Sequence, residues 1–151
     1  MPSSLYGVRR QAAVTVLSLS MIGAAASVCA QAPVRVRLDT ETVLNGVGVA
    51  CTGIGQTKDQ ARWGSYPIRV EFANATQDYM AGEIVTVSDE KGAALMTVAC
   101  AGPWLLLKPP TAGAYRVDAR LTQQDNAPRS ATVRSPEHGQ TRFILTFPNG
   151  R

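Results

Sequence analysis

Hydrophobic and polar residues alternate with a period of two in several short stretches of the chain. Ile68, Val70 and Phe72 fall on one face of such a stretch, and Arg69 and Glu71 fall on its other face. This alternation is typical of a β-strand that is buried on one side only. The same pattern, or a short apolar or β-branched run, recurs at residues 34–38, 84–87, 94–98, 104–107, 115–121, 131–133 and 143–147. We therefore expect seven or eight short strands.

Turn residues separate the expected strands. Asp89-Glu90-Lys91-Gly92 predicts a hairpin connection, and Gly102-Pro103 and Pro109-Pro110 predict further turns. One short helix is expected near residues 56–63, whereas residues 46–51 are predicted to be a turn or bulge. Because long helical periodicity is absent, the sequence predicts an all-β, two-sheet antiparallel sandwich of the transthyretin-like or immunoglobulin-like kind.

The first thirty residues have the three parts of a secretory signal peptide. Arg9 and Arg10 form the positive end, residues 12–28 form an apolar run, and Val28-Cys29-Ala30 precedes the expected cleavage site. Cleavage leaves residues 31–151 as one β-sandwich domain, with its core at about residues 44–148, in the periplasm or outside the cell and without a membrane span. Lipid attachment at Cys29 and export by the twin-arginine route are the alternatives.

Removal of the signal takes Cys29 with it and leaves Cys51 and Cys100. Two cysteines in an oxidising compartment allow a single intramolecular pairing. A redox or metal-binding pair is the alternative, but the sequence has no Cys-x-x-Cys spacing and no histidine near either cysteine. We therefore predict a structural disulfide between Cys51 and Cys100.

Two adjacent segments resemble the carboxypeptidase regulatory-like, or transthyretin-like, β-sandwich family. Residues 102–110 read Gly-Pro-Trp-Leu-Leu-Leu-Lys-Pro-Pro, and residues 113–119 read Gly-Ala-Tyr-Arg-Val-Asp-Ala. Such modules have a strand, a Pro-Pro-Gly-like turn and a Tyr-x-Val-x-Ala strand, although Thr111 and Ala112 lengthen the turn here. The likeness covers about residues 50–147 and extends to small periplasmic proteins of proteobacteria. It implies a β-sandwich fold and a non-catalytic role.

The charge of the chain does not favour a nucleic-acid partner. The 151 residues carry 15 basic and 11 acidic side chains, a formal net charge of +4. Arg9 and Arg10 belong to the expected signal, whereas all the acidic residues lie beyond it. The remaining excess of two positive charges is typical of an ordinary solvated surface.

Catalytic and metal-binding residues are sparse. His138, the single histidine, lies in a turn-like Ser-Pro-Glu-His-Gly stretch with no nucleophile elbow in the sequence. Met80 and Met96 are the methionines that remain after the signal, and we expect them to pack in or near the core. The sequence therefore predicts no catalytic residues, no metal site and no cofactor, and a protein that is not an enzyme.

A surface that binds a partner is the remaining hypothesis. Trp63, Tyr66 and Tyr79 lie near expected strand ends and are candidates for a contact surface, with Trp104 as a further aromatic residue. The alternative role of these rings is packing at the ends of the sandwich. We expect a protein-interaction or accessory module that binds another envelope protein, through this surface or through a strand edge. A carbohydrate- or peptide-binding domain is the alternative.

Overall fold

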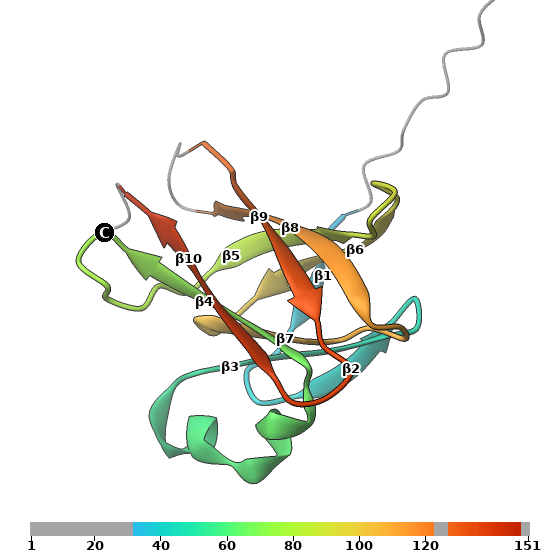
Figure 1. Ribbon diagram of the computed structural model, residues 1–151. Coiled ribbons are helices and arrows are strands. Elements are labelled where there is room, and N and C mark those ends of the chain that lie inside the picture. The colour runs from blue at the N-terminus through green and yellow to red at the C-terminus, as the bar shows by residue number, and fades with distance from the viewer. Residues whose placement is uncertain (1–31, 123–126, 149–151) are drawn as a thin grey trace, which may run out of the picture. The chain divides into compact units, whose positions relative to one another are not determined.

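The computed structural model describes residues 32–122 and 127–148, which form two five-stranded β-sheets and two short helices (Figure 1). Sheet A contains, in spatial order, β1 (Val34–Val36), β6 (Ala94–Cys100), β5 (Glu83–Ser88), β8 (Gly113–Leu121) and β9 (Arg129–Ser135). Sheet B contains β10 (Thr141–Phe147), β4 (Ile68–Asn74), β7 (Trp104–Lys108), β3 (Val47–Thr52) and β2 (Glu41–Leu44). The predicted all-β sandwich is confirmed.

Pairing within the sheets is mostly antiparallel, as predicted. The exceptions are β1, which runs parallel to β6, and β10, which runs parallel to β4. These two strands are edge strands, one in each sheet. Each can run parallel to its neighbour because a long connection, rather than a tight hairpin, joins the two in the sequence.

The prediction of a turn or bulge at residues 46–51 is wrong for most of that segment. The turn is confined to Asn45 and Gly46, which have φ angles of 49° and 80°, and β3 follows directly. Val49 and Cys51 of β3 face the core, and Ala50 on the opposite face is also buried. A strand covered on both sides has no polar alternation, so the pattern concealed it.

The short helix expected near residues 56–63 is present as two 3-10 helices, η1 (Gly55–Asp59) and η2 (Ala61–Ser65). They lie below sheet B in the view of Figure 1. Gln60 separates them in an extended conformation, and its backbone N–H closes η1 on the Thr57 carbonyl at 3.2 Å. The segment covers part of the outer face of sheet B.

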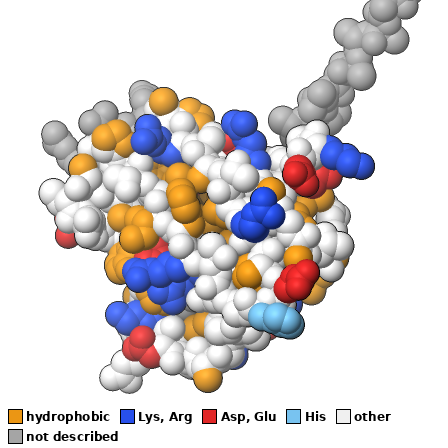
Figure 2. All heavy atoms as spheres, viewed as in Figure 1, with side chains coloured by type: hydrophobic (Ala, Val, Ile, Leu, Met, Phe, Trp, Pro, Cys, Tyr) orange, Lys and Arg blue, Asp and Glu red, His pale blue; other side chains and the backbone are white. Residues whose placement is uncertain are grey.

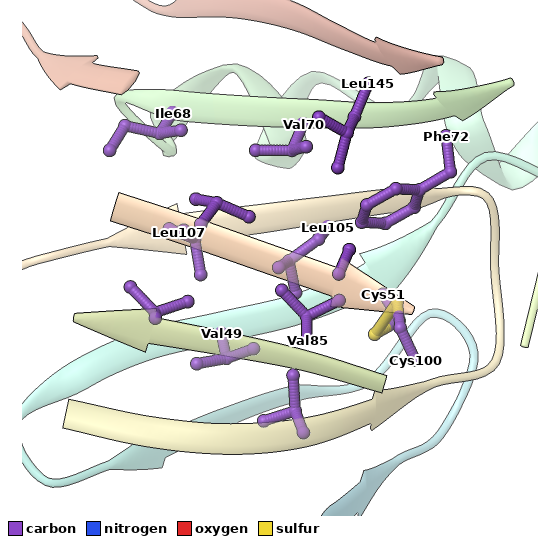
Figure 3. Close-up of a cluster of buried hydrophobic side chains, with 14 of the residues drawn as sticks. Val49, Cys51, Ile68, Val70, Phe72, Val85, Cys100, Leu105, Leu107 and Leu145 are labelled. Atoms are coloured by element: carbon purple, nitrogen blue, oxygen red, sulfur yellow. A yellow bond between two sulfur atoms is a disulfide. The ribbon is translucent and has the colours of Figure 1, made fainter. Parts of the chain in front are cut away.

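The core lies between the sheets (Figure 3). Ile68, Val70 and Phe72 of β4 are fully buried there, as their alternation predicts. Met96 is buried in the same cluster and Met80 packs against it, which confirms the expected role of both methionines.

The predicted disulfide joins the two sheets. Cys51 in β3 and Cys100 in β6 are bonded, with their Cα atoms 5.6 Å apart (Figure 3). Both residues belong to the core cluster. The cross-link therefore lies inside the sandwich rather than at its surface.

One carboxyl group, that of Glu83, is buried in the core. Glu83 begins β5, has no exposed surface, and lies opposite Cys100 and Leu121 in the register of sheet A. Neither carboxyl oxygen has a hydrogen-bond partner among the described residues. Burial raises the pKa of Glu83 to about 8. The group is therefore mostly protonated at pH 7.

The expected signal peptide, residues 1–30, lies outside the described residues. Among the residues that are described, no helix has the length and apolar character needed to cross a bilayer.

Candidate binding site

The outer face of sheet B carries a connected group of polar and aromatic side chains. β4 directs Ile68 and Val70 into the core, so its intervening residues Arg69 and Glu71 point outward. In register, Glu71 lies opposite Trp104 of β7. The group is thus built by the same alternation that builds the core.

Glu71 is the centre of this group. Its side chain is fully buried, yet both oxygens accept hydrogen bonds from charged donors. The Arg142 Nε and Nη2 atoms donate to Oε1 and Oε2 at 2.6 and 2.7 Å, and the Arg69 Nε donates to Oε1 at 2.7 Å. The Tyr79 hydroxyl donates to Oε2 at 2.8 Å. These four bonds fix the three donor side chains around one carboxylate.

Burial pushes the pKa of Glu71 upward, but the hydrogen bonds from Arg142, Tyr79 and Arg69 outweigh it, so the pKa is lowered. Glu71 is therefore ionised at neutral pH. Its lowered pKa stabilises the fold at any pH above about 4.5, the ordinary value of a glutamate, and this contribution is lost as the pH falls through the folded-state pKa.

Trp104 lies beside the charged group and is held from three directions. The Arg69 guanidinium stacks 4.1 Å from the centre of its ring, and the Tyr79 ring meets it edge-on with centroids 6.0 Å apart. A Cβ atom at Gly53 would come within 2.7 Å of the Trp104 Cγ, so only glycine fits there. Trp104 is 6% exposed, and its ring nitrogen has no hydrogen-bond partner among the described residues.

Three side chains beside Glu71 and Trp104 are exposed to solvent. Tyr79 is 48% exposed, Ile144 on the edge strand β10 is 46% exposed, and the side chain of Arg142 is 52% exposed. Ile144 lies opposite Glu71 in the register of β10 and β4. We call Tyr79, Arg142 and Ile144 the β10 surface.

The structure separates the three aromatic residues proposed from the sequence. Trp63 and Tyr66 are each 3% exposed, and their ring centroids lie 6.3 Å apart. Both rings pack on Ala50 and Leu106. They belong to an interior cluster beneath η2 rather than to an open platform. Tyr79 is exposed, and its aromatic neighbour is Trp104.

Hydrogen bonds show the packing role of Trp63 and Tyr66. The Trp63 ring nitrogen donates to the Thr57 carbonyl at 2.7 Å, and the Gln140 amide donates to the Trp63 and Tyr66 carbonyls at 2.8 Å each. Burial and the nearby charge of Glu41 raise the pKa of Tyr66 to about 12, so its hydroxyl stays neutral. These contacts fasten the 3-10 segment to sheet B.

The sequence interpretation missed Arg69, Glu71, Arg142 and Ile144. Arg69 and Glu71 were visible as outward residues of a strand, but nothing in the sequence placed Arg142 beside them. The structure also puts His138 in the exposed loop between β9 and β10. Within residues 32–122 and 127–148, no three His, Cys, Asp or Glu side chains are grouped in a way that could hold a metal ion.

We expect Glu71→Gln to lower the free energy of unfolding at pH 7 by about 2 kcal/mol, because it replaces charge-assisted hydrogen bonds with neutral ones. The loss is moderate because Arg142 is half exposed and can hydrate. Urea unfolding at pH 7 and pH 3 checks this, since the difference should shrink below about pH 4.5, where Glu71 takes up a proton in the unfolded chain. Glu137→Gln in the exposed β9–β10 loop is the control. A difference that is the same at both pH values contradicts the prediction.

Comparison with known proteins does not test the resemblance to carboxypeptidase regulatory-like modules, which therefore remains a prediction. No protein-family model matches the sequence, and no curated protein matches it.

Proposed function

We propose that this chain is a non-enzymatic, exported β-sandwich module that binds another protein of the bacterial envelope through the β10 surface. The observation that carries this proposal is the combination of exposed and fixed side chains. Tyr79 and Arg142 are open to solvent, yet both are held by the buried Glu71 carboxylate. Tyrosine and arginine dominate the energetics of protein interfaces, and preorganised side chains lose little entropy on binding.

The position of this surface at a sheet edge favours a protein partner. β10 is an outer strand of sheet B, and among the described strands its hydrogen-bonded neighbour in that sheet is β4. A strand of another protein can pair with such an edge while its side chains contact Ile144 and Tyr79. β9 of sheet A packs against part of this edge, and its Arg129 side chain donates a hydrogen bond to the Thr146 carbonyl of β10 at 3.1 Å. A partner strand would therefore pair only with the part of the edge that β9 leaves open.

Two further features support export and the family resemblance. The Cys51–Cys100 disulfide is the kind of cross-link that forms in an oxidising compartment. It agrees with the signal-like composition of residues 1–30. The two-sheet architecture is the one that the resemblance to carboxypeptidase regulatory-like modules implies.

A photo-crosslinking residue at position 144, in cells that express the full chain, tests the proposed surface. We expect one specific crosslinked protein, identified by mass spectrometry, and no such product from position 54. Ile54 is a matched control because it is 47% exposed, compared with 46% for Ile144. With the purified partner, Tyr79→Ala should weaken binding by at least about tenfold, as expected for an interface anchor. The same adducts from both positions would contradict the proposal.

Binding of a carbohydrate or a short peptide is the second candidate function, favoured by the exposed Tyr79 ring beside Trp104. A ligand that stacks on Tyr79 would alter the fluorescence of Trp104. A saturable response across a glycan and peptide panel, lost in Tyr79→Ala, would favour this candidate over a protein partner.

A further inference from the structure

The outer face of sheet A collects arginines and almost no acidic residues. Arg35 of β1, Arg116 and Arg120 of β8, and Arg134 of β9 are all exposed on this face. Asp118 is the acidic side chain among them, and it is bound to Arg116 at 2.9 Å and to Ser130. Within the described residues, Arg35, Arg120 and Arg134 take part in no ion pair. Figure 2 shows separate Lys and Arg side chains over the region that β8 and β9 occupy in Figure 1.

The composition of the chain conceals this asymmetry. An excess of two positive charges beyond the expected signal is small, but most of the described acidic residues lie away from the outer face of sheet A. Asp39, Glu41, Asp59, Glu71 and Asp78 belong to sheet B and its connections, and Glu83 is buried in the core. Asp89 and Glu90 lie at the tip of the β5–β6 turn, beyond the strands of the face. Sheet A therefore presents a positive face although the domain as a whole is nearly balanced.

Short side chains form the floor between the arginines. The register aligns Arg35, Ala99, Ile84 and Arg120 in one row across β1, β6, β5 and β8. Neighbouring strands lie about 4.8 Å apart, so the two arginines of this row are roughly 14 Å apart at their Cα atoms. The next row contains Thr97 and Thr86, whose hydroxyls are hydrogen-bonded to each other at 3.0 Å. It ends on β8 at Asp118, whose charge is paired with Arg116. The result is a shallow apolar and hydroxyl-bearing floor with a guanidinium on either side.

A hollow lies at the β1 end of the same row. It has a volume of about 640 Å³, and its lining includes Arg35, Arg37, Gly82, Ala99 and Thr122. The Thr122 hydroxyl and backbone N–H both donate to the Gly82 carbonyl, at 2.8 and 3.2 Å, which fixes one wall. Among the described residues, no acidic side chain lines the hollow. Two arginines in such a place suit a carboxylate, because guanidinium groups bind carboxylates with paired hydrogen bonds.

The type of basic residue favours a protein as the partner. The basic residues of this face are all arginine, whereas Lys58, Lys91 and Lys108 lie in η1, in the β5–β6 turn and on β7. Arginine is enriched and lysine depleted at protein interfaces. Small apolar and threonine side chains between the arginines can contact a polypeptide directly. A dense row of mixed lysine and arginine, as polyanion binders use, is not what this face presents.

We propose that the outer face of sheet A docks an acidic segment of another protein, with one carboxylate seated between Arg35 and Arg37 and a second at Arg120. This surface lies on the opposite sheet from the β10 surface, so the two do not compete for the same side chains. The module would then have two protein-binding faces and could connect two envelope proteins.

The test measures binding of a fluorescent twelve-residue peptide of alternating Glu and Ser by anisotropy, with the purified full domain at low salt. Arg35→Gln combined with Arg120→Gln should weaken binding by about tenfold, because two charge-paired contacts are lost. Lys58→Gln combined with Lys108→Gln removes the same charge from exposed positions in η1 and on β7 of sheet B, and should change binding by less than about twofold. Both variants alter exposed residues, and thermal unfolding verifies that each remains folded.

Three results would overturn the proposal. They are an absence of peptide binding by the unaltered protein, an equal loss in the two double variants, and an arginine-dependent preference for a sulfated polysaccharide or phosphatidylglycerol vesicles over the peptide. The first two would exclude a specific acidic site, and the third would replace the protein partner with another class of anion. Tyr79→Ala should leave peptide binding unchanged, so this test is independent of the β10 surface.

Discussion

Glu83→Gln is expected to stabilise the protein strongly at alkaline pH and to leave its stability almost unchanged below pH 5. The reason is the position of Glu83 in the core, fully buried beside the disulfide and without a hydrogen-bond partner among the described residues. Its pKa is about 8 in the folded state, against an ordinary value of 4.5 that applies to the unfolded chain.

The direction of this pH dependence follows from the pH at which Glu83 loses its proton in the folded and in the unfolded state. Below about pH 4.5 both states keep the proton, so Glu83 adds no pH dependence. Between about pH 4.5 and 8 the unfolded chain ionises while the folded protein does not, so the unfolded state gains stability as the pH rises. Above pH 8 both states are ionised and the full cost is reached, on the order of 5 kcal/mol.

Urea unfolding of both proteins from pH 4.5 to pH 9 at constant ionic strength measures this effect. The free energy of unfolding of the variant should exceed that of the unaltered protein by a margin that grows with pH and levels off above pH 8. Glu90→Gln, in the exposed β5–β6 turn, is the matched control and should show no growing margin. A constant difference between Glu83→Gln and the unaltered protein across this range would mean that Glu83 does not change protonation on unfolding.

Strands buried on one face were the part of the fold that could be predicted from the sequence. The alternation around Phe72 and the Asp89–Gly92 hairpin both describe local structure, and both are present, with Asp89 Oδ1 accepting hydrogen bonds from the backbone of Lys91 and Ala93. β3 was missed because its outer face is covered by the 3-10 segment. That covering is a tertiary contact, and it removes the polar positions by which a strand is recognised.

The candidate site was less predictable because it depends on register. Arg142 reaches Glu71 across 71 positions of the chain, through the parallel pairing of β10 with β4. Trp63 was predicted to be part of the contact surface, but its ring packs in the cluster between η2 and sheet B, whereas the ring of Trp104 supports the exposed Tyr79. Glu83 continues the inward series of Val85 and Val87, so the pattern did place it in the core. The core position of Glu83 was overlooked because carboxylate side chains are expected on the protein surface.

Loss of the Cys51–Cys100 disulfide is the second large effect that we expect. The bond closes a loop between residues 49 positions apart, and a cross-link of that length lowers the entropy of the unfolded chain by an amount worth about 4 kcal/mol in the chain-entropy model. The double variant Cys51→Ala with Cys100→Ala should therefore lose about 4 kcal/mol in urea unfolding and on the order of 20 °C in Tm.

Because both cysteines are in the core, the double variant also loses packing, and the reduced protein separates the two contributions. Thiols occupy nearly the same space as the disulfide, so the unaltered protein in strong reductant should lose most of the same free energy. Reductant should have no effect on the double variant. If the reduced protein unfolds at the same urea concentration as the oxidised one, the disulfide does not stabilise the fold by constraining the unfolded chain. In that case apolar packing between the two sheets keeps β3 and β6 together.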